Sequence, residues 1–174
     1  SSTVIFRKAV FVTKSGSLVE LDGVSPLVFP VSFDDNIYIV LYHRNHLAIM
    51  SNLPVTPNLG SYSYDFSAGA GQVYGGTIGY KEIGNGYWGM AGGDGTADGQ
   101  VNNVDKNDVW SPEAGASGYL SGDFTMDGQV NNTDKNDVWA PNTGMGGQVP
   151  ADPVLSGKQQ NQVPKNGYRS AVPE

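Results

Sequence analysis

Oxygen-bearing side chains recur at a fixed spacing in two segments of this chain of 174 residues. Residues 93–110 read GDGTADGQVNNVDKNDVW and residues 122–139 read GDFTMDGQVNNTDKNDVW, which are identical at fifteen of eighteen positions and 29 residues apart. In each copy three such side chains occupy alternate positions, a glycine follows, and a further aspartate closes a twelve-residue loop. This spacing is typical of a calcium loop, because Ca²⁺ takes about six to eight oxygen ligands and the chain must wrap around the ion.

The position of each residue within the loop predicts its role. Gly99 and Gly128 would allow the sharp bend, and Val101 and Val130 would point inward between the loops. The predicted ligands of the first ion are Asp94, Thr96, Asp98, the Gln100 backbone carbonyl, Asn102 directly or through water, and Asp105 with both oxygens. The corresponding ligands of the second ion are Asp123, Thr125, Asp127, the Gln129 carbonyl, Asn131 and Asp134.

The acidity of the chain is confined to this repeated region. Residues 87–145 contain nine acidic residues and two lysines, which equals the formal charge of −7 of the whole chain. Carboxylates crowded in each loop would repel one another without a cation, and two Ca²⁺ ions would reduce the charge of the region to −3. We therefore expect folding of the region to be coupled to calcium. Magnesium fits less well because it prefers a rigid octahedron that includes several waters, and the remaining alternative is an Asp- and Asn-rich turn without an ion.

Residues 88–145 resemble the tandem calcium-binding repeats of type I dockerins, in which an EF-hand-like loop is followed by only the exiting helix. Those repeats have Asp at the twelfth loop position, where Asp105 and Asp134 stand here. The resemblance implies two Ca²⁺ ions, a short helix after each loop over about 103–110 and 132–139, and a cohesin-like protein as a partner. It also implies a secreted protein at the surface of a bacterial cell.

The repeats also differ from many dockerins. Thr96 and Thr125 replace Asn or Asp, and a hydroxyl ligand should weaken each site modestly. The pairs at 103–104 and 132–133 are Asn-Val and Asn-Thr, whereas many dockerins carry a small hydroxyl pair that contributes to partner recognition.

The region before the repeats is predicted to be mainly β. Residues 3–13, 18–21, 37–44 and 61–66 are rich in β-branched and aromatic residues and are separated by turn signals. Strands this short and this closely spaced favour a β-sandwich over residues 1–86, Ig-like or prealbumin-like, with a glycine-rich connection from residue 67. The order of a strand, an ELDG turn and an HRNHL segment resembles modules of large secreted bacterial surface proteins.

Two features of the chain suggest association between proteins. Such modules have a further strand before the one that opens at Thr3, so its absence here would leave an open sheet edge for a strand of another chain. Residues 146–174 form a tail rich in Pro, Gly and Gln, whose scattered apolar residues, Tyr168 among them, suit an extended strand docked on the same chain or on another subunit.

Two further pairs of side chains have alternative interpretations. His43 and His46 form the pattern H-x-x-H, but no Cys or third His accompanies them, which favours a structural role at a strand end over a zinc site. Trp110 and Trp139 occupy equivalent places in the two copies. They either pack within the repeated region or against the sandwich, or form an exposed platform that binds protein or sugar.

Other classes of function lack support in the sequence. The chain has no cysteine, no basic cluster for nucleic acid, no apolar run long enough to span a membrane, and no recognised catalytic motif. We expect a secreted, non-enzymatic, calcium-binding structural protein at the bacterial cell surface that self-associates through its sheet edge or tail, for instance into a filament. The alternatives are a docking module for a cohesin-like receptor and a carbohydrate-binding adhesin.

Overall fold

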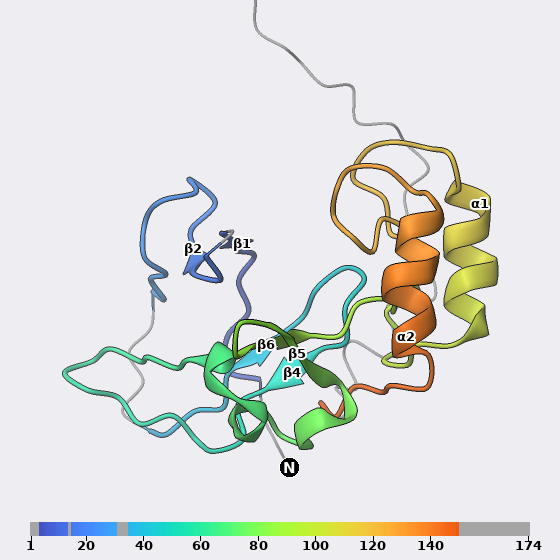
Figure 1. Cartoon of the computed structure of the whole chain (residues 1–174). Coiled ribbons are helices and arrows are strands. Elements are labelled where there is room, and N and C mark those ends of the chain that lie inside the picture. The colour runs from blue at the N-terminus through green and yellow to red at the C-terminus, as the bar shows by residue number, and fades with distance from the viewer. Residues whose placement is uncertain (1–3, 14, 31–34, 150–174) are drawn as a thin grey trace, which may run out of the picture. The chain divides into compact units, whose positions relative to one another are not determined.

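The computed structural model describes residues 4–13, 15–30 and 35–149 (Figure 1). The contacts between its residues divide the chain into two compact units, and one internal segment belongs to the same unit as the C-terminal half. Unit 1 consists of Ser1–Leu41 and Ile49–Met90, and unit 2 of Tyr42–Ala48 and Ala91–Glu174.

Unit 1 contains three separate antiparallel pairs of strands. The pairs are β1 (Phe11–Val12) with β2 (Leu18–Val19), β3 (Val40–Leu41) with β4 (Ile49–Met50), and β5 (Tyr80–Gly84) with β6 (Tyr87–Met90). The predicted β-sandwich is therefore wrong, because the described residues form three small two-stranded sheets and no pair of sheets packed face to face.

The apolar runs of unit 1 pair over much shorter lengths than their composition suggested. The run 3–13 contributes only β1, whose side chains Phe11 and Val12 are more than half exposed. The run 61–66 is not a strand, since a single bridge at Ser61 is followed by irregular chain and a 3₁₀ turn, η1 (Phe66–Ala68). β-branched and aromatic residues favour strands only where another strand and a packed face are available, and most of these segments have neither.

The longest hairpin lies in the glycine-rich stretch that was predicted to be only turns and connection. Strands β5 and β6 meet at Asn85-Gly86, with φ of 54° and 78°. Positive φ at both positions is typical of a type I′ turn, for which Asn-Gly is the preferred pair. Two further 3₁₀ turns precede the hairpin, η2 (Ala70–Gln72) and η3 (Gly76–Ile78).

The core of unit 1 is small and is built from side chains of this hairpin, of β4 and of neighbouring segments. Ile49, Val73 and Tyr80 are buried, and four partly buried side chains pack around them: Leu41, Phe66, Trp88 and Met90. The rings of Tyr80 and Trp88 stack at 5.8 Å, and the Tyr80 hydroxyl donates to the Phe66 carbonyl. None of the described apolar residues before Leu41 belongs to this core, and β1 and β2 form a separate two-stranded sheet.

Within its described residues, unit 2 contains two equivalent short helices, each following one of the two loops (Figure 1). Each starts with two α-helical residues, 103–104 or 132–133, continues as π-helix, η4 (Asp105–Trp110) or η5 (Asp134–Trp139), and ends as α-helix, α1 (Ser111–Glu113) or α2 (Ala140–Asn142). The predicted helices are confirmed and run three residues further, past Pro112 and Pro141. The ring of a proline clashes with the carbonyl four residues earlier in a regular α-helix, and the wider winding of the preceding turn relieves this clash.

The core of unit 2 confirms the inward orientation predicted for the two loop valines. Val101 and Val130 are fully buried, and Val101 clusters with Leu47 and Ala91. Trp139 and Met145 pack against this cluster. Among the described residues, no helix has the length and apolar character needed to cross a membrane.

Candidate metal centre

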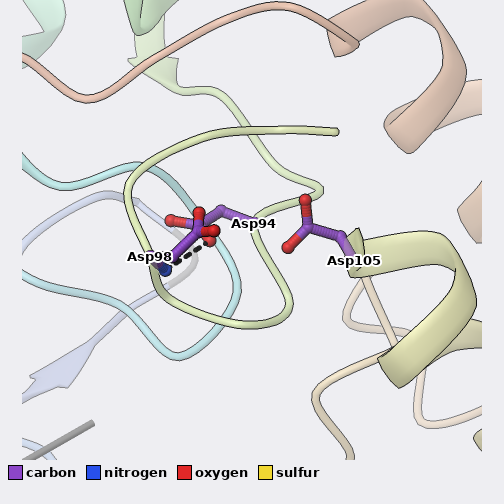
Figure 2. Close-up of side chains that lie close together, drawn as sticks. All are labelled: Asp94, Asp98 and Asp105. Carbon is purple, nitrogen blue, oxygen red and sulfur yellow. Dashed lines mark hydrogen bonds between the residues drawn. The ribbon is translucent and has the colours of Figure 1, made fainter. Parts of the chain in front are cut away.

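The first loop brings three carboxylates together. Asp94, Asp98 and Asp105 each offer an oxygen atom, and these atoms lie within 4.8 Å of one another (Figure 2). Asp94 and Asp105 are buried and Asp98 is exposed, so the group lies at the surface with two of its members pointing inward. All three are residues that the loop spacing predicted as ligands.

Backbone N–H groups of the same loop hold the two buried carboxylates. Asp94 accepts hydrogen bonds from the Asp98 and Gly99 amides, both at 3.1 Å. Asp105 accepts from the Thr96 amide at 3.0 Å and from the Asn102 amide at 2.7 Å. Because the donors belong to the loop that the carboxylates close, the loop is wrapped around these oxygens by its own backbone.

The charges of this group are not balanced within the described part of the chain. Burial, the Asp105 charge and the Asp98 charge raise the pKa of Asp94 to about 7. Two unit charges about 5 Å apart repel by about 3 kcal/mol at an effective dielectric constant near 20. A divalent cation would convert this repulsion into attraction, and three carboxylates are hard oxygen ligands of the kind that Ca²⁺ prefers. The residues therefore fit the ion that their spacing predicts.

The neutral candidate ligands have additional structural roles. The Thr96 hydroxyl donates to Asp105 at 2.8 Å, which leaves its oxygen lone pairs free. The Asn102 side-chain oxygen accepts from the Val104 amide at 2.7 Å and so caps the following helix, which favours water-mediated over direct ligation. The backbone N–H of Gln100 donates to the Asp98 carboxylate at 2.9 Å, and Gln100 forms a β-bridge with Gly146.

The second loop repeats this backbone network. Asp123 accepts from the Asp127 and Gly128 amides, and Asp134 accepts from the Thr125 and Asn131 amides. The other hydrogen bonds of the first loop have equivalents too. The Thr125 hydroxyl donates to Asp134, the Gln129 backbone amide donates to Asp127, and the Thr133 backbone amide donates to the Asn131 side chain. The carboxylates of Asp123, Asp127 and Asp134 do not gather within the distance that joins those of the first loop. One charged contact distinguishes the loops, since Arg44 Nη2 lies 3.3 Å from Asp123 Oδ2.

The two tryptophans connect each helix to the opposite loop. Trp110 donates its indole N–H to the Asn131 carbonyl and Trp139 donates to the Asn102 carbonyl, both at 2.8 Å. Lys135 lies over the Trp110 ring at 4.7 Å, and Lys106 lies over the Trp139 ring at 5.3 Å. Both indoles therefore pack within the repeated region, which was one of the predicted alternatives.

Reciprocal contacts also join the ends of the helices to the loops. The Val101 amide donates to the Met145 carbonyl and the Val130 amide donates to the Ala116 carbonyl, both at 2.9 Å. Each loop is therefore paired with the chain that leaves the helix of the other copy. Since these contacts occur twice with the copies exchanged, each loop is held by residues of both copies.

Residues outside the two loops complete the comparison with the sequence predictions. The rings of His43 and His46 meet edge to face at 4.7 Å, and among the described residues no third His, Cys or acidic group joins them as a metal ligand. Tyr168 lies outside the described residues. Arg44 and Asn45, which contact the second loop, were not predicted, because no pattern in the sequence connects them with residues almost eighty positions later.

Comparison of the chain with protein-family models, curated proteins and solved structures gives no match. The resemblance to dockerin repeats therefore rests on the repeat itself and on its loop spacing. What the chain binds is inferred from its own residues and their geometry.

Proposed function

We propose that this chain is a calcium-binding structural protein of the bacterial cell surface, in which two Ca²⁺ ions stabilise the duplicated unit and which acts by assembly rather than catalysis. The observation that carries the proposal is the pair of loops with buried aspartates, each held by backbone amides and each tied to the helix of the other copy. Such a frame leaves little freedom to separate the charges, so a bound cation stabilises it.

The test for calcium uses full-length protein in buffer freed of metal. Isothermal titration should give two bound Ca²⁺ ions per chain, and a site filled to 100 times its Kd should add about 2.7 kcal/mol to stability. The double variant Asp98→Ala with Asp127→Ala should lose binding. Asp108→Ala with Asp137→Ala is the matched control, because these acids are exposed at equivalent helix positions and take no part in the loop network. Unchanged calcium affinity in the loop variant would reject the loop assignment.

Assembly with further copies of the chain is supported by the character of unit 1. Phe11, Val12, Val24 and Val28 are all more than half exposed, and among the described residues β1 pairs only with β2, whose other side forms a bridge from Val19 to Pro26. Exposed apolar side chains next to unpaired strand edges favour pairing with another strand. Extracellular calcium, which is in the millimolar range, would fill even weak sites, consistent with a secreted protein.

Particle mass and shape test the assembly. Light scattering and negative-stain microscopy of the full chain in millimolar Ca²⁺, and again after chelation, should show polymers that fray or dissolve when calcium is removed. Monomers under both conditions would reject self-assembly.

A docking function is the second candidate, supported by the surface at the start of the helices. Asn103, Val104, Asn132 and Thr133 are exposed at equivalent positions, where the dockerin resemblance places partner recognition. Calcium-dependent capture of a single cohesin-like protein by the full chain, lost in Val104→Asp with Thr133→Asp, would support it. An adhesin that binds sugar through the tryptophans is less well supported, because their indole N–H groups already have partners.

A further inference from the structure

Unit 2 contains the two copies of the repeat and also the segment Tyr42–Ala48, which lies outside both copies in the sequence. We refer to this segment as the strap. Its Arg44 forms the ion pair with Asp123 described above, with side chains only 15% and 2% exposed. The equivalent residue of the first loop, Asp94, makes no such ion pair within the described part of the chain.

The strap is anchored so that Arg44 stays beside the second loop. The Asn45 side chain donates to the Asp123 carbonyl at 2.6 Å and to the Ser121 carbonyl at 3.1 Å. On the other side of the strap, the Gly93 amide donates to the Asn45 carbonyl at 3.0 Å. These bonds hold the backbone at Arg44 next to the second loop, within reach of Asp123.

The guanidinium itself is held in place and incompletely paired. It lies over the Tyr119 ring at 3.7 Å from the centroid. Its Nε atom is buried and has no hydrogen-bond partner in the structure, so Asp123 is the carboxylate that compensates its charge. A hollow of about 360 Å³ lies beside the pair, with Tyr119 and Met126 among its lining residues, and gives solvent a route to this end of the loop.

The two loops therefore present different charges to a cation. In the first, three carboxylate oxygens lie within 4.8 Å with no neighbouring ion pair. In the second loop, the buried carboxylate of Asp123 forms an ion pair with Arg44, and the carboxylates of its three aspartates do not lie within that distance of one another. A cation at the second loop must approach this charge or displace it from Asp123.

We propose that Arg44 makes the two calcium loops unequal, so that the first loop binds Ca²⁺ tightly and the second binds it more weakly because Arg44 competes for Asp123. This inference rests on the proposed calcium binding and adds to it an order of filling. By linkage, filling the second loop weakens the hold of Asp123 on Arg44.

Calcium titration of the full chain against a competing chelator dye tests this directly. The wild type should show two binding steps whose dissociation constants differ by about 10 to 100-fold. Arg44→Met removes the charge and keeps a side chain that can lie over Tyr119, so the weaker step should tighten by about 10-fold or more while the stronger step changes less than about 3-fold. Asp98→Asn and Asp127→Asn should remove the stronger and the weaker step, respectively, and so assign them.

Two controls separate local from general effects. Lys135→Met and Lys106→Met each remove one positive charge at equivalent positions of the two copies, where the lysine lies over a tryptophan ring and not in an ion pair with a loop carboxylate, so each should change the two steps only slightly. Arg44→Lys keeps the charge, so the two steps should remain separate. Circular dichroism in saturating calcium verifies that each variant is folded.

A second measurement needs no substitution. In the wild type, the Arg44 Nε–H resonance in a ¹⁵N spectrum should move with the second equivalent of Ca²⁺ and not with the first. Equal steps in the wild type, an unchanged ratio in Arg44→Met, or a resonance that moves with the first equivalent would each overturn the role of Arg44. Absence of any calcium binding by the wild type would instead overturn the proposed function.

Discussion

Asp94 and Asp123 occupy the same position in the two loops and accept the same two backbone amides, yet their surroundings differ in charge. The charged groups that act on Asp94 are other carboxylates, and burial first and those charges second raise its pKa to about 7. Asp123 instead forms an ion pair with Arg44. The chemistry of the second loop thus depends on one residue outside the repeat, Arg44, as well as on the repeat itself.

The raised pKa of Asp94 leads to a prediction for Asp94→Asn. In chelator at pH 8 the wild-type carboxylate is charged and buried at a cost, which Asn removes. Because Asn can accept only one of the two backbone amides that Asp94 accepts, the net gain in stability should be about 1 to 3 kcal/mol. In saturating calcium the order should reverse, because a ligand has been lost. Urea unfolding followed by tryptophan fluorescence under both conditions measures this, and equal destabilisation in both would contradict it.

The exchanged indole hydrogen bonds predict effects on the opposite loop. Trp110→Phe leaves the Asn131 carbonyl without its donor and should weaken calcium binding at the second loop, and Trp139→Phe should weaken the first. Each should also cost about 1 to 3 kcal/mol of stability, the usual penalty for an unpaired buried polar group. Site-resolved titration in the Asp98→Asn and Asp127→Asn backgrounds measures the effect. Trp88→Phe in unit 1 is the control, and an effect confined to the variant's own loop would be inconsistent with the exchange.

His46 predicts how stability depends on pH. Burial, with His43 and Arg44 nearby, lowers its pKa to about 3, so the folded protein keeps it neutral while the unfolded chain protonates it near pH 6.5. Its contribution is therefore fully present above pH 6.5 and is lost as pH falls through that value toward 3, at up to about 1.4 kcal/mol per pH unit.

Urea unfolding in saturating calcium between pH 7.5 and 5.5 tests this prediction. His46→Asn, which retains a donor near the Asn45 side-chain oxygen, should show a shallower loss of stability over this range. His43, whose pKa is lowered by burial and by the Arg44 charge, should contribute to the remaining slope. A slope equal to that of the wild type would exclude His46 as its source.

At the scale of elements, short pieces are positioned by a few residues with special backbone angles. The hairpin of β5 and β6 turns on Asn85 and Gly86, whereas the helices of unit 2 are set by contacts with the opposite loop. Gly93 and Gly122 make that approach possible, since a Cβ there would lie 3.2 Å from the Trp139 Cα and 3.1 Å from the Trp110 Cα. Reciprocal glycines and tryptophans thus fit each helix against the start of the other loop.

The hairpin turn predicts a local effect of Gly86→Ala. Alanine at a φ of 78° should cost about 1 kcal/mol and reduce the protection of the β5 and β6 amides in hydrogen exchange. Gly71→Ala is the matched control, because no atom lies within 4 Å of a Cβ there and its φ is not in the left-handed region. Equal losses in the two variants would show that the turn conformation is not what the substitution disturbs.

For the whole molecule, the two units should respond differently to calcium. Both loops belong to unit 2, as does the strap, whose Leu47 packs with Val101 and whose Arg44 pairs with Asp123, so chelation should lower hydrogen-exchange protection over residues 42–48 and 91–149. Residues 49–90, whose core is formed by Ile49, Val73 and Tyr80, should keep theirs. Exchange followed by mass spectrometry with and without chelator measures both regions. Uniform loss across them would mean that calcium stabilises the chain as a single cooperative unit.

What the sequence by itself determined about this protein is local. The loop spacing, the bend glycines, the inward valines and the helix after each loop all depend on residues within about a dozen positions, and the structure places them as predicted. The Asn85-Gly86 turn was equally local and could have been predicted from that dipeptide.

Only the tertiary structure decided which distant segments meet. The strand-like runs of the first part did not form a sandwich, because a strand needs a partner and a packed face that its own residues do not specify. The carbonyls that receive the indole N–H groups, and the joining of residues 42–48 to the repeats, depend on contacts across tens of positions. The charge of Arg44 distinguishes two loops of nearly identical sequence, since electrostatic energy depends on distance in space and not on separation along the chain.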